Sequence, residues 1–196
     1  MKNLLSLIIL LISINIYSQN IQFTVNNIEN HVITVEHFKP QTNGKFFYFS
    51  DFTIDEDGQN SSYTEIFQYW KCFTVQYNFG MNEAFKFSPV YLFGLSKDIN
   101  IKDINFTFDL LYRYENSLIT ENKIIENSNY QLSMSYIYDS DNLTVNGFVD
   151  YWNIDRYIFN CQIWYKIDSN FQIGTKGYLS NEIPSNVSLG IKYLVD

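Results

Sequence analysis

Apolar and polar residues alternate with a period of two along most of the chain. Between residues 131 and 138, one face carries Leu132, Met134, Tyr136 and Tyr138, and the other carries Gln131, Ser133 and Ser135. The same alternation recurs around residues 104–113, 159–166 and 187–193. Successive side chains of a β-strand point to opposite faces, so the pattern predicts strands with one apolar and one polar face. No stretch after residue 18 keeps the 3.6-residue period of a helix.

Twelve segments carry this alternation, most of them about 8 to 11 residues long, and polar breaks separate them. We expect strands at Asn20–Asn26, His31–Phe38, Lys45–Ile54, Ser62–Trp70, Cys72–Phe79, Phe85–Leu95, Asp103–Tyr114, Asn129–Asp139, Leu143–Trp152, Tyr157–Ile167, Phe171–Leu179 and Asn186–Leu194. The weakest division is at Lys71, because residues 62–79 could form one long strand and leave only eleven. Bacterial single-chain membrane barrels have even strand numbers, which favours twelve.

The lengths of the breaks support a barrel with two different ends. The shortest breaks, which follow the fourth, eighth and tenth segments, are Lys71, Ser140–Asn142 and Asp168–Asn170. The two longest, Asp55–Ser61 and Glu115–Ser128, follow the third and seventh. Outer-membrane barrels have short periplasmic turns and longer outer loops, which is the order seen here. The break Ser96–Lys102 does not fit, because it is a longish turn on the short side.

Segment length and aromatic placement favour a membrane-spanning barrel over a soluble one. A strand tilted by about 45° needs roughly 9 to 11 residues to cross a bilayer. Aromatic residues near the segment ends suit the interfacial girdles of such barrels, and they are Tyr69, Trp70, Tyr112, Tyr114, Tyr136, Tyr138, Tyr151, Trp152 and Tyr193. Alternation alone also fits a soluble sandwich or lipocalin-like barrel, in which the apolar faces would point inward.

We therefore predict an all-β protein: a closed, antiparallel, up-and-down transmembrane β-barrel of about 12 strands in the outer membrane of a Gram-negative cell. Hydrocarbon offers no partner to backbone N–H and C=O groups, so only a closed sheet can span it. The polar faces of the strands would then line a wet or ion-paired lumen. The apolar faces would contact outer-membrane lipid.

The first eighteen residues have the features of a secretory signal peptide. Lys2 provides the positive start, residues 4–16 form an apolar core, and Ser18 is a small residue for cleavage. This core is shorter than the roughly 20 residues that a spanning helix needs. We expect a signal peptide at 1–18 and a single barrel domain at 19–196.

Composition and charge exclude several classes of function. The chain has 13 Lys and Arg against 21 Asp and Glu, without a basic cluster, so nucleic-acid binding has no electrostatic basis. Cys72 and Cys161 lie in apolar segments and are expected to be unpaired thiols. No catalytic or metal-binding motif is present, so we expect no enzyme activity, metal or cofactor. The acidic run Asp55–Asp57 fits a solvated turn better than a cation site.

Several short motifs occur in an order that resembles the Tsx-like nucleoside-specific channel family and its outer-membrane relatives. They are Val35–Pro40, Lys45–Phe52, Asp55–Gly58, Tyr63–Ile66, Val75–Asn78, Tyr91–Gly94, Gly147–Trp152 and Gln162–Tyr165. The resemblance extends over nearly the whole chain after residue 18. It implies a monomeric, twelve-stranded outer-membrane barrel with a narrow channel for nucleosides.

The leading functional hypothesis is passive diffusion of small polar solutes such as nucleosides. Aromatic rings beside carboxylates and amides would suit a flat base joined to a polyhydroxyl sugar. The candidate lumen-lining residues are Glu36, Phe38, Asp51, Glu65, Asp109, Arg113, Phe148, Asp150, Trp152 and Trp164. Two alternatives stay open. One is a non-conducting structural barrel filled by its own side chains, and the other is a soluble exported β-barrel that binds a small apolar ligand.

Overall fold

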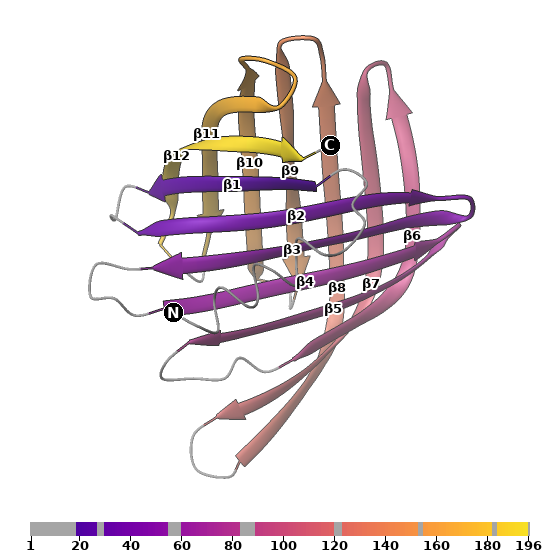
Figure 1. Cartoon of the computed structure of the whole chain (residues 1–196). Coiled ribbons are helices and arrows are strands. Elements are labelled where there is room, and N and C mark those ends of the chain that lie inside the picture. Colours follow the sequence, from indigo (N-terminus) through magenta and orange to yellow (C-terminus); the bar gives the residue numbers. More distant parts are fainter. Residues whose placement is uncertain are drawn as a thin grey trace.

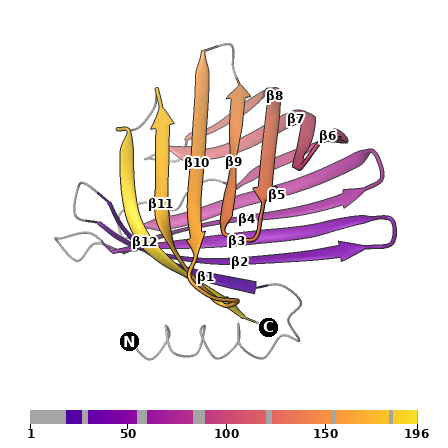
Figure 2. The same cartoon turned by 90° about the horizontal axis from the view of Figure 1, so that it is seen from above.

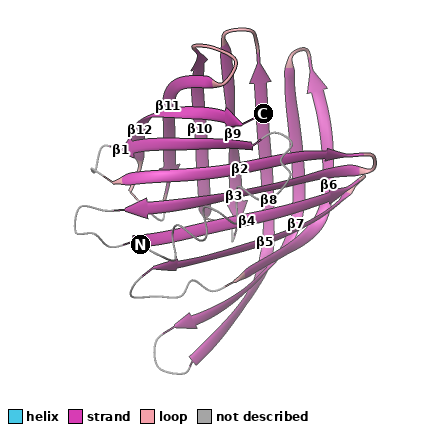
Figure 3. Ribbon diagram, in the orientation of Figure 1, coloured by secondary structure: helices cyan, strands magenta, loops and turns pink. Residues whose placement is uncertain are grey.

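The structure is a computed structural model that describes residues 19–26, 30–54, 60–82, 89–119, 123–152, 155–181 and 184–195. The expected signal peptide at 1–18 and the acidic run Asp55–Asp57 lie outside these residues. Among the described residues there are strands and connecting loops, and no helix that could cross a membrane (Figure 3).

The described residues form twelve antiparallel strands that close into one barrel (Figure 1). The strands are β1 Gln19–Asn26, β2 His31–Gln41, β3 Gly44–Ile54, β4 Asn60–Trp70, β5 Phe73–Asn82, β6 Val90–Ile101, β7 Ile104–Ile119, β8 Lys123–Asp139, β9 Leu143–Trp152, β10 Arg156–Lys166, β11 Phe171–Ser180 and β12 Asn186–Val195. Each strand pairs with its neighbours in sequence, and β1 pairs with β12 to complete the ring. The predicted closed up-and-down barrel of twelve strands is confirmed.

The register fixes which side chains point into the barrel, because directly paired residues of an antiparallel sheet share one face. Asp109 of β7 pairs with Ser133 of β8, which pairs with Asp150 of β9. One residue further along β7, Leu110 pairs with Leu132 of β8. Asp109 is 8% exposed and Leu110 is 50% exposed, so the first row faces inward and the second faces outward.

The outer surface of the barrel is apolar and its interior is largely polar. Outward-facing side chains that are strongly exposed include Phe73, Phe93, Leu95, Leu110, Leu132, Val187 and Leu189. Inward-facing side chains that are buried include Gln22, Thr24, Thr34, Gln76, Gln131, Asn160, Gln162 and Gln172. A soluble barrel needs the opposite arrangement, with its large apolar side chains inside. The prediction of a lipid-facing apolar surface is confirmed, and the soluble alternative is wrong.

Two of the expected breaks between strands are wrong. The segment Ser96–Lys102 is not a long turn: β6 continues to Ile101, and the turn is Lys102 and Asp103 alone. Lys102 has a φ of 53° in this turn, a left-handed conformation that two-residue hairpins require. The expected loop 115–128 is also mostly strand, since β7 and β8 pair as far as Ile119 and Lys123.

The first of these corrections removes the one long turn from the short-turn end. The connections between β2 and β3, β4 and β5, and β6 and β7 are two residues each, and β8–β9 and β10–β11 have three and four. All five lie at the end where β1 begins and β12 ends, which is the periplasmic end of an outer-membrane barrel.

The two free cysteines allow this orientation to be tested. Cys72 is exposed in the short β4–β5 turn, whereas Cys161 faces outward from the middle of β10. We expect a maleimide coupled to a polyethylene glycol too large for porins to label Cys72 only after the outer membrane is permeabilised. The Cys72→Ser variant should stay unlabelled in both conditions, because lipid covers Cys161. Labelling of Cys72 in intact cells would place the short turns outside.

Candidate functional site

All ten predicted lumen-lining residues lie on the inward face of the barrel. The register places Glu36 beside Asn20, Asp51 beside Thr34, and Glu65 beside Asn78. Pairing with other inward-facing residues places seven more side chains on the inward face: Phe38, Asp109, Arg113, Phe148, Asp150, Trp152 and Trp164.

Neutral donors from β4 and β5 hold the carboxylate of Glu65. Gln76 donates its Nε2 hydrogen to Glu65 Oε2 at 3.0 Å, and Asn78 Nδ2 donates to Oε1 at 3.2 Å. The Tyr63 hydroxyl also donates to Oε1. Hydrogen bonds to a carboxylate stabilise it without cancelling its charge. These bonds therefore fix the orientation of the Glu65 carboxyl group on the inward face.

Arg113 of β7 lies on the inward face, in the same row of paired residues as Gln76 and two strands away from it, and it contacts several side chains. Its Nη1 donates to Gln131 Oε1 at 3.0 Å, and its Nη2 lies 3.4 Å from Glu115 Oε2. Its guanidinium lies over the ring of Trp152, 5.2 Å from the ring centre. The indole Nε1 of Trp152 is buried and has no hydrogen-bond partner among the described residues. The surrounding side chains cover this nitrogen, so it is an unsatisfied buried donor.

Contacts between strands that are not neighbours cross the lumen. Lys176 Nζ of β11 lies 3.8 Å from Asp51 Oδ2 of β3, although β12, β1 and β2 separate these strands in the wall. The Tyr69 hydroxyl of β4 lies 3.5 Å from Asp109 Oδ2 of β7. Figures 1 and 2 show β3 and β4 passing across the strands of the far wall. The lumen is narrow where these side chains meet.

A polar hollow of about 340 Å³ lies at the short-turn end of the lumen. Its wall contains Thr42, Asn43, Gly44, Lys45, Tyr69, Lys71, Ser96 and Asp98. Lys45 Nζ binds Asp98 Oδ1 at 2.7 Å and Thr107 Oγ1 at 2.8 Å, and it lies 4.7 Å from the ring centre of Tyr69. These contacts join β3 and β4 to β6 and β7 and narrow the mouth.

A second tryptophan of the lumen wall, Trp164, lies on β10 beside β11. Trp164 is fully buried, and its Nε1 donates to Gln162 Oε1 at 2.9 Å. Lys192 Nζ lies 5.2 Å from the centre of its ring. Gly174, its partner on β11, has no side chain, which leaves room for the ring against the wall. Trp164 is therefore part of the packed lining of the lumen.

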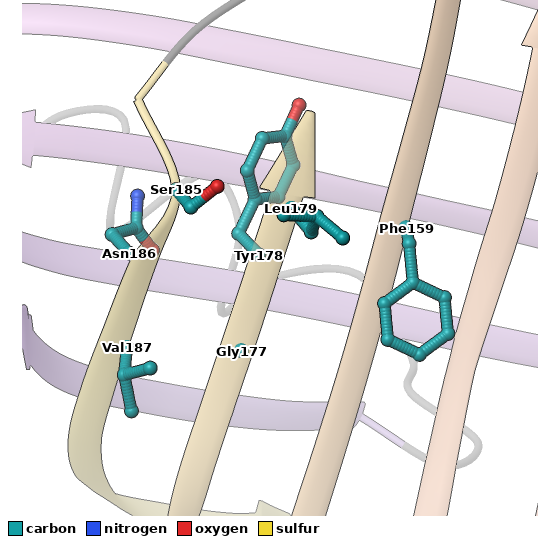
Figure 4. Close-up of a pocket in the computed structure, with 7 residues that line it drawn as sticks. All are labelled: Phe159, Gly177, Tyr178, Leu179, Ser185, Asn186 and Val187. Atoms are coloured by element: carbon teal, nitrogen blue, oxygen red, sulfur yellow. The ribbon is translucent and has the colours of Figure 1, made fainter. Parts of the chain in front are cut away.

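One hollow of about 330 Å³ lies on the outer surface and not in the lumen (Figure 4). Its wall includes the outward-facing Phe159, Leu179 and Val187 around Gly177. All three side chains are exposed on the lipid-facing side. This hollow is a gap in the apolar belt and is not part of the solute path.

Sequence reasoning missed several inward-facing residues. Tyr63, Leu92 and Leu111 line the lumen, and Tyr69 does so too, although it was expected in an interfacial girdle. Trp152, expected both in a girdle and in the lumen, faces the lumen alone. The segment 45–54 carries aromatic residues on both faces, so alternation could not show which face of this strand points into the lumen. The pairing of Asp51 with Thr34, which faces inward, identifies the lumen-facing side of this strand.

The described residues contain no group of three or more His, Cys, Asp or Glu side chains placed to hold a metal ion. Glu36 and His37 point to opposite faces, as expected for neighbours in a strand, with Glu36 beside Asn20 and His37 beside Tyr48. The described part of the lumen wall consists of charged and hydrogen-bonded polar side chains together with aromatic rings.

Comparison with known proteins gives a family and a shared fold. Residues 15–190 match the family described as "Domain of unknown function (DUF5020)". The chain belongs to this family. No curated protein matches the sequence significantly.

The KdgM porin in complex with disordered oligogalacturonate is 14% identical, with a TM-score of 0.55 over 92% of this chain and 100% of that one. The NanC porin is 10% identical, with a TM-score of 0.57 over 91% and 100%. Such low identities show the fold alone. Together with the apolar outer surface, this fold places the DUF5020 protein in the outer membrane.

Proposed function

We propose that the barrel is a passive channel for small polar solutes, nucleosides among them. The observation that supports it is the inward face, where aromatic rings stand beside carboxylates and amides. Phe148, Trp152 and Trp164 come from the adjacent strands β9 and β10. Glu65 and Asp150 face the same lumen from opposite walls.

A nucleoside needs both kinds of group. Its flat base is apolar on its faces and gains free energy by stacking on an aromatic ring. Its sugar hydroxyls need hydrogen-bond partners once they leave bulk water. The half-buried carboxyl groups of Asp150 and Glu65 offer acceptors on the inward face.

Swelling of liposomes in isosmotic solute tests the proposal. We expect the purified barrel to raise the swelling rate with uridine or adenosine above that of empty liposomes. Trp152→Leu should lower the nucleoside rate relative to the rate of a neutral sugar by about five-fold, because stacking contributes about 1 kcal/mol or more. Tyr151→Leu is the matched control, because Tyr151 is the next residue and faces lipid. No nucleoside uptake by inserted protein would rule the proposal out.

A closed structural barrel is the second candidate, and the contacts across the lumen favour it. Lys176 with Asp51, and Tyr69 with Asp109, join distant parts of the wall. A twelve-stranded barrel has a modest interior that such side chains can fill. A filled barrel would leave the swelling rate unchanged for every solute, including sugars and ions, while inserting normally.

A further inference from the structure

We infer that the middle of the lumen selects cationic and neutral solutes over anionic ones, through a cluster of four carboxylates. The carboxylate cluster consists of Asp51, Glu65, Asp109 and Asp150. This inference rests on the proposed channel function and adds the charge of the solute to it.

The four carboxylates lie close enough to act on one another across the lumen. Asp109 and Asp150 both belong to the row of paired residues that runs through Ser133, and Asp51 is paired with Tyr63, two residues from Glu65. Glu65 on β4 also interacts electrostatically with Asp150 on β9 and with Asp51 on β3. Asp150 is in turn within range of Asp109 on β7. Four different strands therefore direct negative charge toward one region of the lumen.

Most of the hydrogen bonds to this cluster come from neutral groups. The donors are Thr34 for Asp51, Tyr63, Gln76 and Asn78 for Glu65, and Tyr69 for Asp109. Such donors hold the carboxylates in place and leave their charge uncancelled. A wall built only for stability would be expected to pair buried charges with opposite ones.

The cations near the cluster are too few to balance it. Lys176 lies 3.8 Å from Asp51, which is a loose ion pair. Arg113 acts on Glu65 and Asp150 from a distance, but its own N–H groups bind Gln131 and Glu115. Of the other inward lysines, Lys45 is paired with Asp98 and Lys166 with Asp139 at the short-turn end, and Lys192 lies over the ring of Trp164.

An uncompensated ring of carboxylates in a narrow passage attracts cations and repels anions. The low-dielectric wall focuses this field, and rings of Asp or Glu are how cation-selective pores discriminate. The KdgM porin shares the fold, and its structure was determined with oligogalacturonate, an anionic saccharide. We expect the carboxylate cluster of the DUF5020 protein to exclude such a polyanion.

The reversal potential in a planar bilayer tests this inference. With a ten-fold KCl gradient at pH 8.5, where carboxyl groups are ionised, we expect K⁺ to permeate about ten-fold better than Cl⁻. The double variant Glu65→Gln, Asp150→Asn should bring the two permeabilities within about two-fold of each other. Arg113→Gln should raise the preference for K⁺, which keeps the test open if the double variant does not insert.

Asp141→Asn is the matched control, since Asp141 lies exposed in the β8–β9 turn and should leave the ratio unchanged. A steady current with equal permeabilities, or with a preference for Cl⁻, overturns the inference and leaves the channel proposal standing. The absence of any current from correctly inserted protein overturns both.

Discussion

Replacing Leu110 by arginine is expected to lower the free energy of unfolding in a bilayer by about 2 to 4 kcal/mol. Leu110 is 50% exposed on β7, between Leu95 and Leu132 on the neighbouring strands. It lies six residues beyond the start of β7. At about 3.3 Å per residue and a tilt of about 45°, that places it about 14 Å from the periplasmic end, near the bilayer centre. Urea titration of tryptophan fluorescence in lipid vesicles measures the change.

A second arginine variant shows whether lipid or water surrounds Leu110. Asp141→Arg, in an exposed periplasmic turn, should change the free energy of unfolding by less than about 0.5 kcal/mol. Heat-modifiable mobility on a gel reports whether each variant has folded. If Leu110→Arg were as harmless as Asp141→Arg, water rather than lipid would surround this surface, and the membrane barrel would be wrong.

The strand pattern was predictable because each wall position of a barrel faces one of two different solvents. Segments such as 131–138 alternate strictly, since lipid on one side and the polar lumen on the other leave little freedom. The expected and observed bounds agree closely from β8 onward to β12, apart from the start of β8. The errors fall where a local signal is missing. Lys102 adopts a positive φ in its turn, and the sequence gives no sign of this because a lysine occupies the position where glycine is usual.

Local sequence pattern predicts only two of the four members of the carboxylate cluster securely, and it does not predict that the four form a cluster. Asp109 and Asp150 were identifiable from alternation alone. Asp51 and Glu65 lie in aromatic strands, and only the register with β2 shows that they face the lumen. That the four lie together depends on which strands face each other across the closed barrel, and local pattern carries no information on that distance.

Replacing Gly174 of β11 by valine is expected to destabilise the barrel, whereas the same change at Gly177 of β11 is not. Gly174 faces the lumen, and a Cβ atom there would lie 2.1 Å from the Ile163 carbonyl oxygen and 2.7 Å from Cε3 of Trp164. Neither neighbour can move freely, because one is backbone in the β10–β11 ladder and the other is fully buried. We expect Gly174→Val to lower the free energy of unfolding by about 1 to 3 kcal/mol through overpacking. The same urea titration measures it.

Gly177→Val is the control that the same strand supplies. A Cβ atom at Gly177 would meet only the Cys161 carbonyl oxygen, at 3.8 Å, and would point into the apolar hollow on the outer surface (Figure 4). Filling that hollow with an apolar side chain should leave stability unchanged or raise it by about 0.5 to 1 kcal/mol, because glycine weakens a strand. If both variants destabilised the barrel equally, the cause would be the loss of glycine itself. If Gly174→Val were tolerated, the ring of Trp164 would not lie against this wall, and its place in the lumen would need another explanation.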